Sequence, residues 1–242
     1  MNLSQFNHTT CNEPEIYEQL PLDNKNILEL GCGKADITRL IANGGPGRKI
    51  TATEVDKIQH AKNRLIDDLP NVTFIVGGSE KIPADDAIFD VIFMFKSLHH
   101  VPTELMDDAL SEVERVLKPD GIAYISEPVF KGDFNEVLRL FHDEELVRAA
   151  AHKAIKQAVA KKSLTPLEEV NFNSPMSFSD FEDFENKIIK VTHTQHALSP
   201  QLQKKVKDQF ALNMGDDSAK FLMPIRVDLL QKPANSPRLY SH

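Results

Sequence analysis

Two groups of residues in the first quarter of the chain could together hold a nucleoside. Gly31, Cys32 and Gly33 directly follow a short apolar segment, and a helix pattern begins soon after them. Glycines at such a place let the backbone come close to a ligand, and the first turn of a helix offers N–H groups to a polar group. Glu54 ends the next strand-like segment, 21 positions after Gly33. A carboxylate at that distance is placed to bind both hydroxyls of a ribose.

Strand-like segments alternate with amphipathic helix patterns through the first half of the chain. The predicted strands cover residues 26–30, 49–54, 72–76, 90–95 and 122–126. This alternation favours a parallel sheet with helices on both faces, and such sheets bind ligands at the carboxyl ends of their strands. We therefore expect the functional residues just beyond the last residue of each strand.

The second half of the chain has a different pattern. Residues 131–165 look wholly helical, and a helix is also expected over residues 199–212. Residues 177–193 suggest a helix followed by a strand at 188–192. A last strand is predicted over residues 221–230, where Pro224 favours an edge strand or a bulge.

The glycine loop, residues 27–33 (ILELGCG), resembles the signature loop of class I S-adenosylmethionine (SAM) dependent methyltransferases. Residues 77–83 resemble the adenine loop of that family, and residues 89–102 resemble its fourth strand and the loop that follows. Residues 114–121 resemble the turn before its fifth strand, so that the resemblance covers residues 27–128. Together, these four stretches are a specific resemblance to that family, although no single stretch is specific by itself.

The resemblance implies an α/β fold, a three-layer sandwich in which a seven-stranded, mostly parallel sheet has helices on both faces. Six strands would be parallel, and one antiparallel strand near residues 221–231 would lie at the edge. We expect one domain over residues 1–242, with residues 131–175 as a helical cap inserted after the fifth strand. That cap would cover the acceptor pocket and select the acceptor.

The resemblance also implies SAM as the cofactor, with S-adenosylhomocysteine as its product. Glu29 and the glycine loop would hold the methionine part, Glu54 the ribose, and Val55 the adenine face. The implied cofactor-binding residues are Glu29, Gly31, Cys32, Gly33, Glu54, Val55, Ser79, Glu80, Phe95 and Lys96. The adenine loop of many members has an Asp where this chain has Gly78, so Glu80 or a backbone carbonyl must accept the adenine amino group here. An NAD enzyme would place a glycine at Asp36, whose charge disfavours a pyrophosphate.

Two histidines beyond the fourth predicted strand could supply a general base. His99 and His100 follow that strand, and Glu127 ends the fifth one, which is its neighbour in this fold. Removal of a proton from an acceptor is commonly the work of a histidine. Our hypothesis is that Glu127 orients His99 as a catalytic pair. The alternative is that one histidine satisfies a loop backbone group while Glu127 is solvated.

The sequence indicates no metal site. Cys11 and Cys32 are the only cysteines and do not form a CxxC pair. His193 and His196 are three positions apart, but no carboxylate cluster adjoins them. Cys32 could be read as a reactive thiol at a helix start, yet a small residue beside the cofactor is the better interpretation.

The formal net charge of -8 makes this chain a poor candidate to coat nucleic acid. No signal peptide or membrane-spanning segment is seen, so we expect a cytoplasmic protein with no membrane partner. A small-molecule acceptor is the leading expectation. An RNA (tRNA) base is an alternative, since the expected helix contains a basic run (Arg148, Lys153, Lys156, Lys161 and Lys162). A SAM-binding protein without turnover is another, and a nucleotide-binding oxidoreductase is the least favoured.

Overall fold

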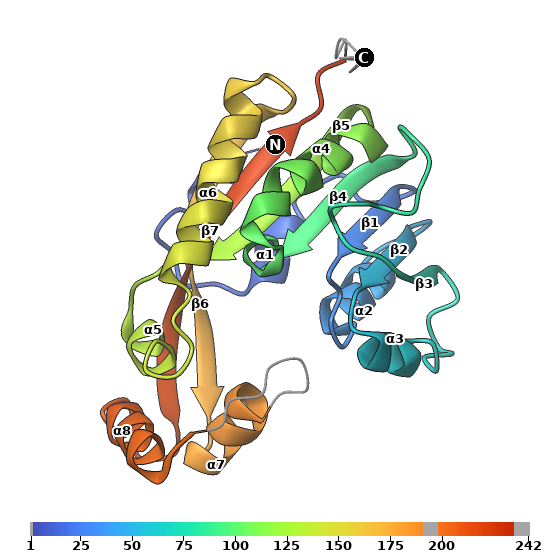
Figure 1. The fold of residues 1–242 in the computed structure, drawn as a ribbon. Helices are drawn as coiled ribbons and strands as arrows, with labels where there is room; N and C mark the ends of the chain where they lie inside the picture. Colours follow the sequence, from blue (N-terminus) through green and yellow to red (C-terminus); the bar gives the residue numbers. More distant parts are fainter. Residues whose placement is uncertain (1, 191–197, 235–242) are drawn as a thin grey trace.

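A seven-stranded sheet is the centre of the fold in this computed structural model, which describes residues 2–190 and 198–234 (Figure 1). The strand order is β3-β2-β1-β4-β5-β7-β6. The strands are β1 (Asn26–Leu30), β2 (Lys49–Glu54), β3 (Val72–Val76), β4 (Phe89–Phe95), β5 (Leu117–Pro128), β6 (Thr165–Phe178) and β7 (Ala219–Gln231). The five strands predicted in the first half of the chain are confirmed.

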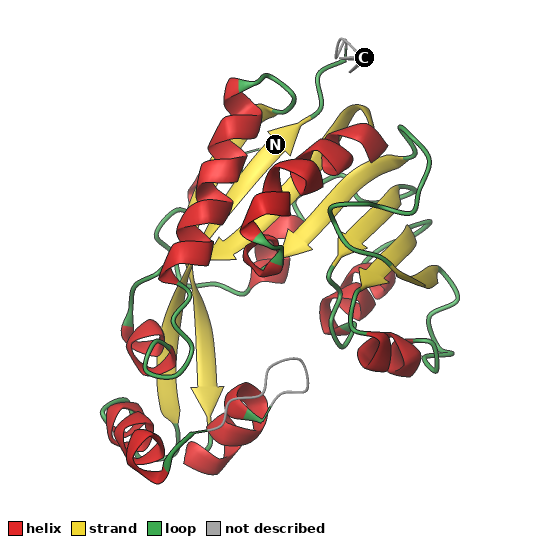
Figure 2. Cartoon of the chain, viewed as in Figure 1, coloured by secondary structure: helices red, strands yellow, loops and turns green. Residues whose placement is uncertain are grey.

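Helices surround this sheet (Figure 2). They are α1 (Glu13–Tyr17), α2 (Asp36–Asn43), α3 (Lys57–Asn63), α4 (Met106–Val116), α5 (Asp133–Leu138), α6 (Glu145–Ala160), α7 (Phe181–Phe184) and α8 (Pro200–Ala211). Short helical turns are η1 (Ser4–Phe6), η2 (Leu98–His100), η3 (Thr103–Leu105) and the π-helical η4 (Glu185–Ile189). Among the described residues, no helix has the length and apolar character needed to span a membrane.

Six of the seven strands run parallel, as expected, and β7 runs antiparallel to both of its neighbours. The expected position of the antiparallel strand was wrong, because β7 lies between β5 and β6 and the edge strand is β6. Pro224 of β7 pairs with Asn173 of β6, just beyond the last residue that β7 pairs with β5. The carbonyl of Pro224 accepts a hydrogen bond from the N–H of Val129, and a proline, which lacks an N–H, is tolerated where the pairing with β5 ends.

Each face of the sheet has its own apolar core, which gives the three layers. Ile16 and Tyr17 of α1 and Ile41 of α2 belong to the core on one face. On the other face, Val113 of α4 and Ile155 of α6 pack in a second core, and both are almost completely buried. The fold therefore places helices on both faces of the sheet.

Beyond the sheet, β6 and β7 continue as a two-stranded ribbon that carries α5, α7 and α8 (Figure 1). A third core, which we call the phenylalanine cluster, fills this projection; its buried aromatic residues are Phe134, Phe178, Phe184, Phe210 and Phe221. Residues 131–175, predicted as the cap, are thus divided: α5 lies in the projection, α6 covers the sheet, and β6 begins at Thr165.

Two expectations for the second half of the chain were wrong. The sequence predicted no strand over Thr165–Phe178, yet β6 is there and forms the edge of the sheet. The expected strand at 188–192 is not found either, since Ile188 and Ile189 belong to η4. Residues 191 and 192 lie outside the described part of the chain, as do His193 and His196.

Candidate active site

The glycine loop turns sharply between β1 and α2. Gly31 and Gly33 have φ angles of 76° and 52°, in the left-handed region that glycine adopts without strain. A Cβ atom at Gly31 would also lie 3.0 Å from the Cβ of Ser97, so only glycine fits closely there. The loop is fastened to the next strand, because the N–H groups of Gly31 and Cys32 both donate to the carbonyl of Thr53.

Glu54 joins the end of β2 to this loop. Its Oε2 accepts a hydrogen bond of 2.8 Å from the N–H of Gly33, and its Oε1 accepts one of 2.9 Å from the N–H of Asp56. Both bonds hold the carboxylate at the carboxyl end of the strand, where the sequence placed a ribose-binding acid. The exposed side chain of Val55 follows it directly.

A cavity of about 760 Å³ opens at this edge of the sheet. Its walls come from the glycine loop, the ends of β2, β3 and β4, helix α3 and the segment η2–η3. Asn186 of η4 and Lys190, which directly follows η4, complete them. Seven of the ten predicted cofactor-binding residues line it: Gly31, Gly33, Glu54, Val55, Ser79, Glu80 and Lys96.

The adenine loop explains how the chain departs from the family pattern at Gly78. A Cβ atom built at Gly78 would overlap both carboxylate oxygens of Glu80. The carboxylate of Glu80 is therefore folded back over residue 78. Glu80 thus places an acid beside Gly78 at the wall of the cavity.

Three predicted cofactor-binding residues do not line the cavity. Glu29 is buried beneath the loop, where its carboxylate accepts a 2.6 Å hydrogen bond from the hydroxyl of Thr38. Burial raises the pKa of Glu29 to about 7, and the Thr38 hydrogen bond opposes that rise. The ring of Phe95 packs 5.5 Å from Tyr17 in the core. The thiol of Cys32 is buried, and burial raises its pKa, as for a packing residue rather than a reactive thiol.

Lys96 is held in an unusual backbone conformation at the wall of the cavity. Its φ angle is 52°, which is uncommon for a residue with a side chain. Its Nζ lies 2.6 Å from the carboxylate of Glu13, a buried residue at the start of α1. The short N-terminal helix thus reaches the cofactor side of the sheet through this ion pair.

His99 and Glu127 are in direct contact, as the sequence predicted. Nδ1 of His99 bonds Glu127 Oε2, while the other oxygen of Glu127 accepts a hydrogen bond of 2.9 Å from the N–H of Leu98. His99 is 5% exposed and does not line the cavity. Burial disfavours its charge, but the carboxylates of Glu127 and Glu144 outweigh burial and raise the pKa of His99 to about 9.

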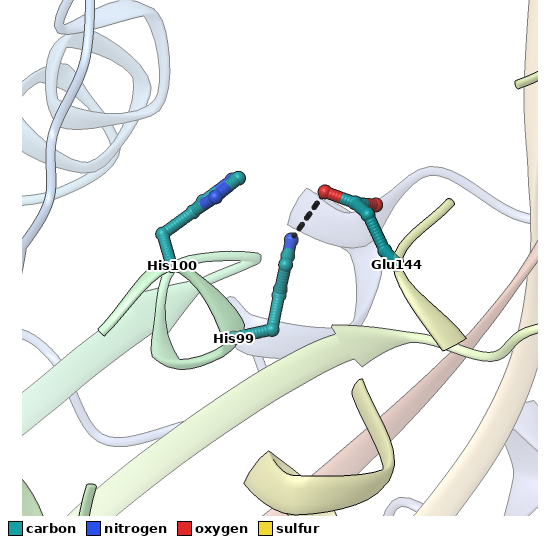
Figure 3. A group of neighbouring side chains, drawn as sticks. All are labelled: His99, His100 and Glu144. Carbon is teal, nitrogen blue, oxygen red and sulfur yellow. Dashed lines mark ion pairs between the residues drawn. The ribbon is translucent and has the colours of Figure 1, made fainter. Parts of the chain in front are cut away.

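The sequence did not indicate Glu144, which approaches His99 from the other side (Figure 3). Its Oε1 lies 3.5 Å from Nε2 of His99 and 2.9 Å from Nε2 of His142. Its Oε2 lies 2.5 Å from Nη2 of Arg148, one helical turn further on. His100 stacks beside His99 with ring centroids 4.1 Å apart, and it is the histidine that lines the cavity.

Further residues of the cavity wall were missed by the sequence interpretation. Asn186 and Lys190 of the η4 segment face the same cavity as Glu54. Their separation of four positions puts them on one face of a helix, a signal that depends on knowing that 181–189 is helical. The others are Lys34, Asp56, Gln59, Lys62, Gly77, Ser97, Val101 and Pro102.

The basic run of α6 is not one continuous surface. Arg148 is buried, where it pairs with Glu144 and donates to the side chain of Asn135. Lys161 forms an ion pair with Asp107 of α4. Lys153 and Lys156 remain exposed on α6, and Lys162 is exposed just after its end.

The residues of the cavity fit an adenosine-containing cofactor that has no phosphates. Glu54 offers its carboxylate where two hydroxyls would be bound, and Glu80 offers a second acid beside Gly78. Glu54, Asp56 and Glu80 line the cavity together with four lysines, Lys34, Lys62, Lys96 and Lys190.

Known proteins share this arrangement. Residues 27–121 match the methyltransferase domain family. An uncharacterized methyltransferase of Synechocystis is 31% identical over 114 residues, which cover 45% of this chain and 52% of that protein. A demethylmenaquinone methyltransferase of Chlorobaculum tepidum is 34% identical over 103 residues, which cover 43% of this chain and 40% of that protein. The chain thus spans about half the length, or less, of these curated relatives.

The fold itself is shared over nearly the whole chain. The crystal structure of a putative methyltransferase from Bacillus halodurans has a TM-score of 0.64 at 15% identity, covering 90% of this chain and 97% of that one. Residues 27–121 therefore carry a methyltransferase domain that is similar to those of SAM-dependent methyltransferases. SAM is the cofactor that this family implies.

Proposed function

We propose that the protein transfers a methyl group from SAM to a small-molecule acceptor. The cavity at the carboxyl ends of the parallel strands carries this proposal. Its volume of about 760 Å³ lies within the range of roughly 300–1,000 Å³ that is usual for cofactor and small-molecule sites.

On the cofactor side, three residues have complementary tasks. The carboxylate of Glu54 accepts hydrogen bonds from the ribose hydroxyls, and the side chain of Val55, which is 64% exposed, supplies an apolar surface for the adenine. Glu80 accepts a hydrogen bond from the adenine amino group. When bound, SAM supplies a methyl group that its sulfonium has activated for displacement.

On the acceptor side, the chain contributes alignment and exclusion of water. Methyl transfer gains much of its rate when two reactants are held in line in a dry site. His100, Asn186 and Lys190 form a polar wall there, which favours an acceptor with hydrogen-bonding groups near its reacting atom. The helical projection that carries Asn186 and Lys190 acts as the cap.

We assign His99 and Glu127 a positioning role. Nδ1 of His99 is bonded to Glu127, Nε2 lies 3.5 Å from Glu144 Oε1, and the ring is buried behind His100. Glu127 also holds the N–H of Leu98, so one carboxylate fixes two consecutive residues of η2. The pair therefore fixes the loop that presents His100 to the cavity, and His99 is not the open general base of the initial hypothesis.

A small molecule is favoured over an RNA base. The basic run was the reason to consider an RNA acceptor, but Arg148 is buried in an ion pair with Glu144 and does not contribute to a basic surface. The remaining lysines of the run lie on the α6 face of the sheet. One relative is named as a methyltransferase of demethylmenaquinone, a small molecule.

The test is to supply SAM labelled with tritium in its methyl group together with a cell extract separated by size. We expect label in the small-molecule fraction with the wild-type protein and much less with a Glu54→Gln variant. Label in the RNA fraction would select the alternative acceptor. Cofactor binding with no label in any fraction would indicate a SAM-binding protein without turnover.

A further inference from the structure

We propose that His99, His100 and Glu144 bind a divalent transition-metal ion beside the cofactor cavity. One possible ligand atom from each of these residues lies within 4.8 Å of those of the other two. Their side chains converge on one region above the strand ends (Figure 3). His99 and Glu144 are buried, while His100 is exposed to the cavity.

The distance between His99 and Glu144 suits two ligands of one ion. Nε2 of His99 and Oε1 of Glu144 are 3.5 Å apart, which is long for a hydrogen bond of roughly 2.7–3.2 Å. Two ligands of a tetrahedral zinc ion, each about 2.0–2.1 Å from the metal, lie about 3.3 Å apart. A rotation of the exposed His100 side chain would bring the third ligand into place.

Two of the proposed ligands, His99 and Glu144, are fixed by neighbouring side chains, as ligands commonly are in known metal sites. Metal-binding histidines commonly donate their second N–H to a carboxylate, which fixes the ring and its tautomer. Here Glu127 bonds Nδ1 of His99, which leaves Nε2 directed at the proposed ion. Glu144 is fixed in turn by Arg148 and His142, one on each oxygen.

The donor set and the fixed charges indicate the class of ion. Two imidazole nitrogens and one carboxylate oxygen suit Zn²⁺ or Fe²⁺, whereas Mg²⁺ and Ca²⁺ prefer oxygen ligands throughout. Glu127 and Glu144 supply two carboxylates beside the proposed ion, and Arg148 pairs with the second of them. Three protein ligands leave a fourth position open, as in catalytic zinc sites.

The open position faces the cavity, because His100 lines it. There the ion would bind an oxygen or nitrogen atom of the acceptor and lower its pKa. This role rests on the proposed methyl transfer, but binding of the ion does not. The sequence interpretation expected no metal because the ligands lack a short motif: His100 and Glu144 are 44 positions apart.

Metal binding can be measured without SAM or an acceptor. The full chain, freed of metal by a chelator, is titrated with Zn²⁺ by calorimetry and with Co²⁺ by its visible absorption. We expect one site per chain. His100→Ala and Glu144→Gln should each weaken Zn²⁺ binding by about 100-fold or more, and Glu127→Gln by about 10–100-fold.

His8→Asn is the matched control, because it removes an exposed imidazole that is not one of the three proposed ligands, and asparagine tolerates the φ of 60° at that residue. It should bind Zn²⁺ as the wild type does. Thermal unfolding shows whether each variant is folded. If Glu144→Gln is unfolded, the result for His100→Ala decides the test, because His100 is exposed. Equal Zn²⁺ affinity in the wild type and in His100→Ala, or no binding at all, would overturn the proposal. A wild-type protein that binds Zn²⁺ but does not bind SAM would instead count against the proposed function alone.

Discussion

The carboxylate of Glu80 occupies the space that a Cβ atom at residue 78 would need, so Gly78 and Glu80 together provide one acid at the wall of the cavity. Glu80→Ala should weaken binding of S-adenosylhomocysteine by about 10–100-fold, the loss of one hydrogen bond to a charged group. Adding Gly78→Asp to that variant should restore binding, because the space is then free. Calorimetric titration of the single and double variants measures both effects. A double variant no better than Glu80→Ala would show that residue 78 does not face the adenine.

Glu54 holds the glycine loop and is expected to bind the ribose. Glu54→Gln should lower the affinity for S-adenosylhomocysteine by about 10–100-fold, since an amide replaces the charged acceptor. Asp67→Asn, the same change of charge at an exposed residue outside the cavity, is the control and should bind as the wild type does. Equal affinities for the two variants would remove Glu54 from the site.

Glu29 should make the protein less stable as the pH rises. Burial raises its folded-state pKa to about 7 from an ordinary 4.5, so between these values the folded chain keeps a proton that the unfolded chain has released. Because the unfolded chain then binds fewer protons, the free energy of unfolding falls through this window, by about 3 kcal/mol in all.

The variant that isolates this effect is Glu29→Gln, whose carbonyl can still accept the hydrogen bond from Thr38. Urea unfolding at about pH 5 and about pH 8 should show a smaller loss of stability in the variant than in the wild type. Cys32 and Tyr17, the titratable groups coupled to Glu29, have raised pKa values and stay neutral in this range. An identical pH dependence in both proteins would mean that Glu29 is not the cause.

Phe184 is fully buried in the phenylalanine cluster of the projection, with ring contacts to Phe178 and Phe210. Phe184→Ala should lower the free energy of unfolding by about 3–5 kcal/mol, the usual cost of emptying such a site. Leu212→Ala at the end of α8, where the side chain is 75% exposed, should change it little. Urea unfolding compares the two, and equal small losses would show that the projection lacks a packed core.

Local sequence patterns predicted the cofactor half of the site. The glycine loop and Glu54 come at the ends of consecutive strands, so their order along the chain already places them together. The approach of Glu144 to His99 could not be predicted in this way, because it depends on how α6 packs across the sheet.

The edge strand β6 was missed for a related reason. Its prolines, Pro166 and Pro175, argue against a central strand, but an edge strand tolerates them. A period of two was present, since Val170, Phe172 and Phe178 are buried at even positions. This alternating pattern was too short to predict a strand directly after the helical pattern of residues 131–165.

The central claim is that the cavity binds an adenosine cofactor without phosphates, and titration of the full chain with S-adenosylhomocysteine and with NAD tests it most directly. We predict saturable binding of one S-adenosylhomocysteine per chain and no binding of NAD, because the glycine loop carries Asp36 where a dinucleotide-binding loop has its third glycine. Binding of NAD with no binding of S-adenosylhomocysteine would contradict the account.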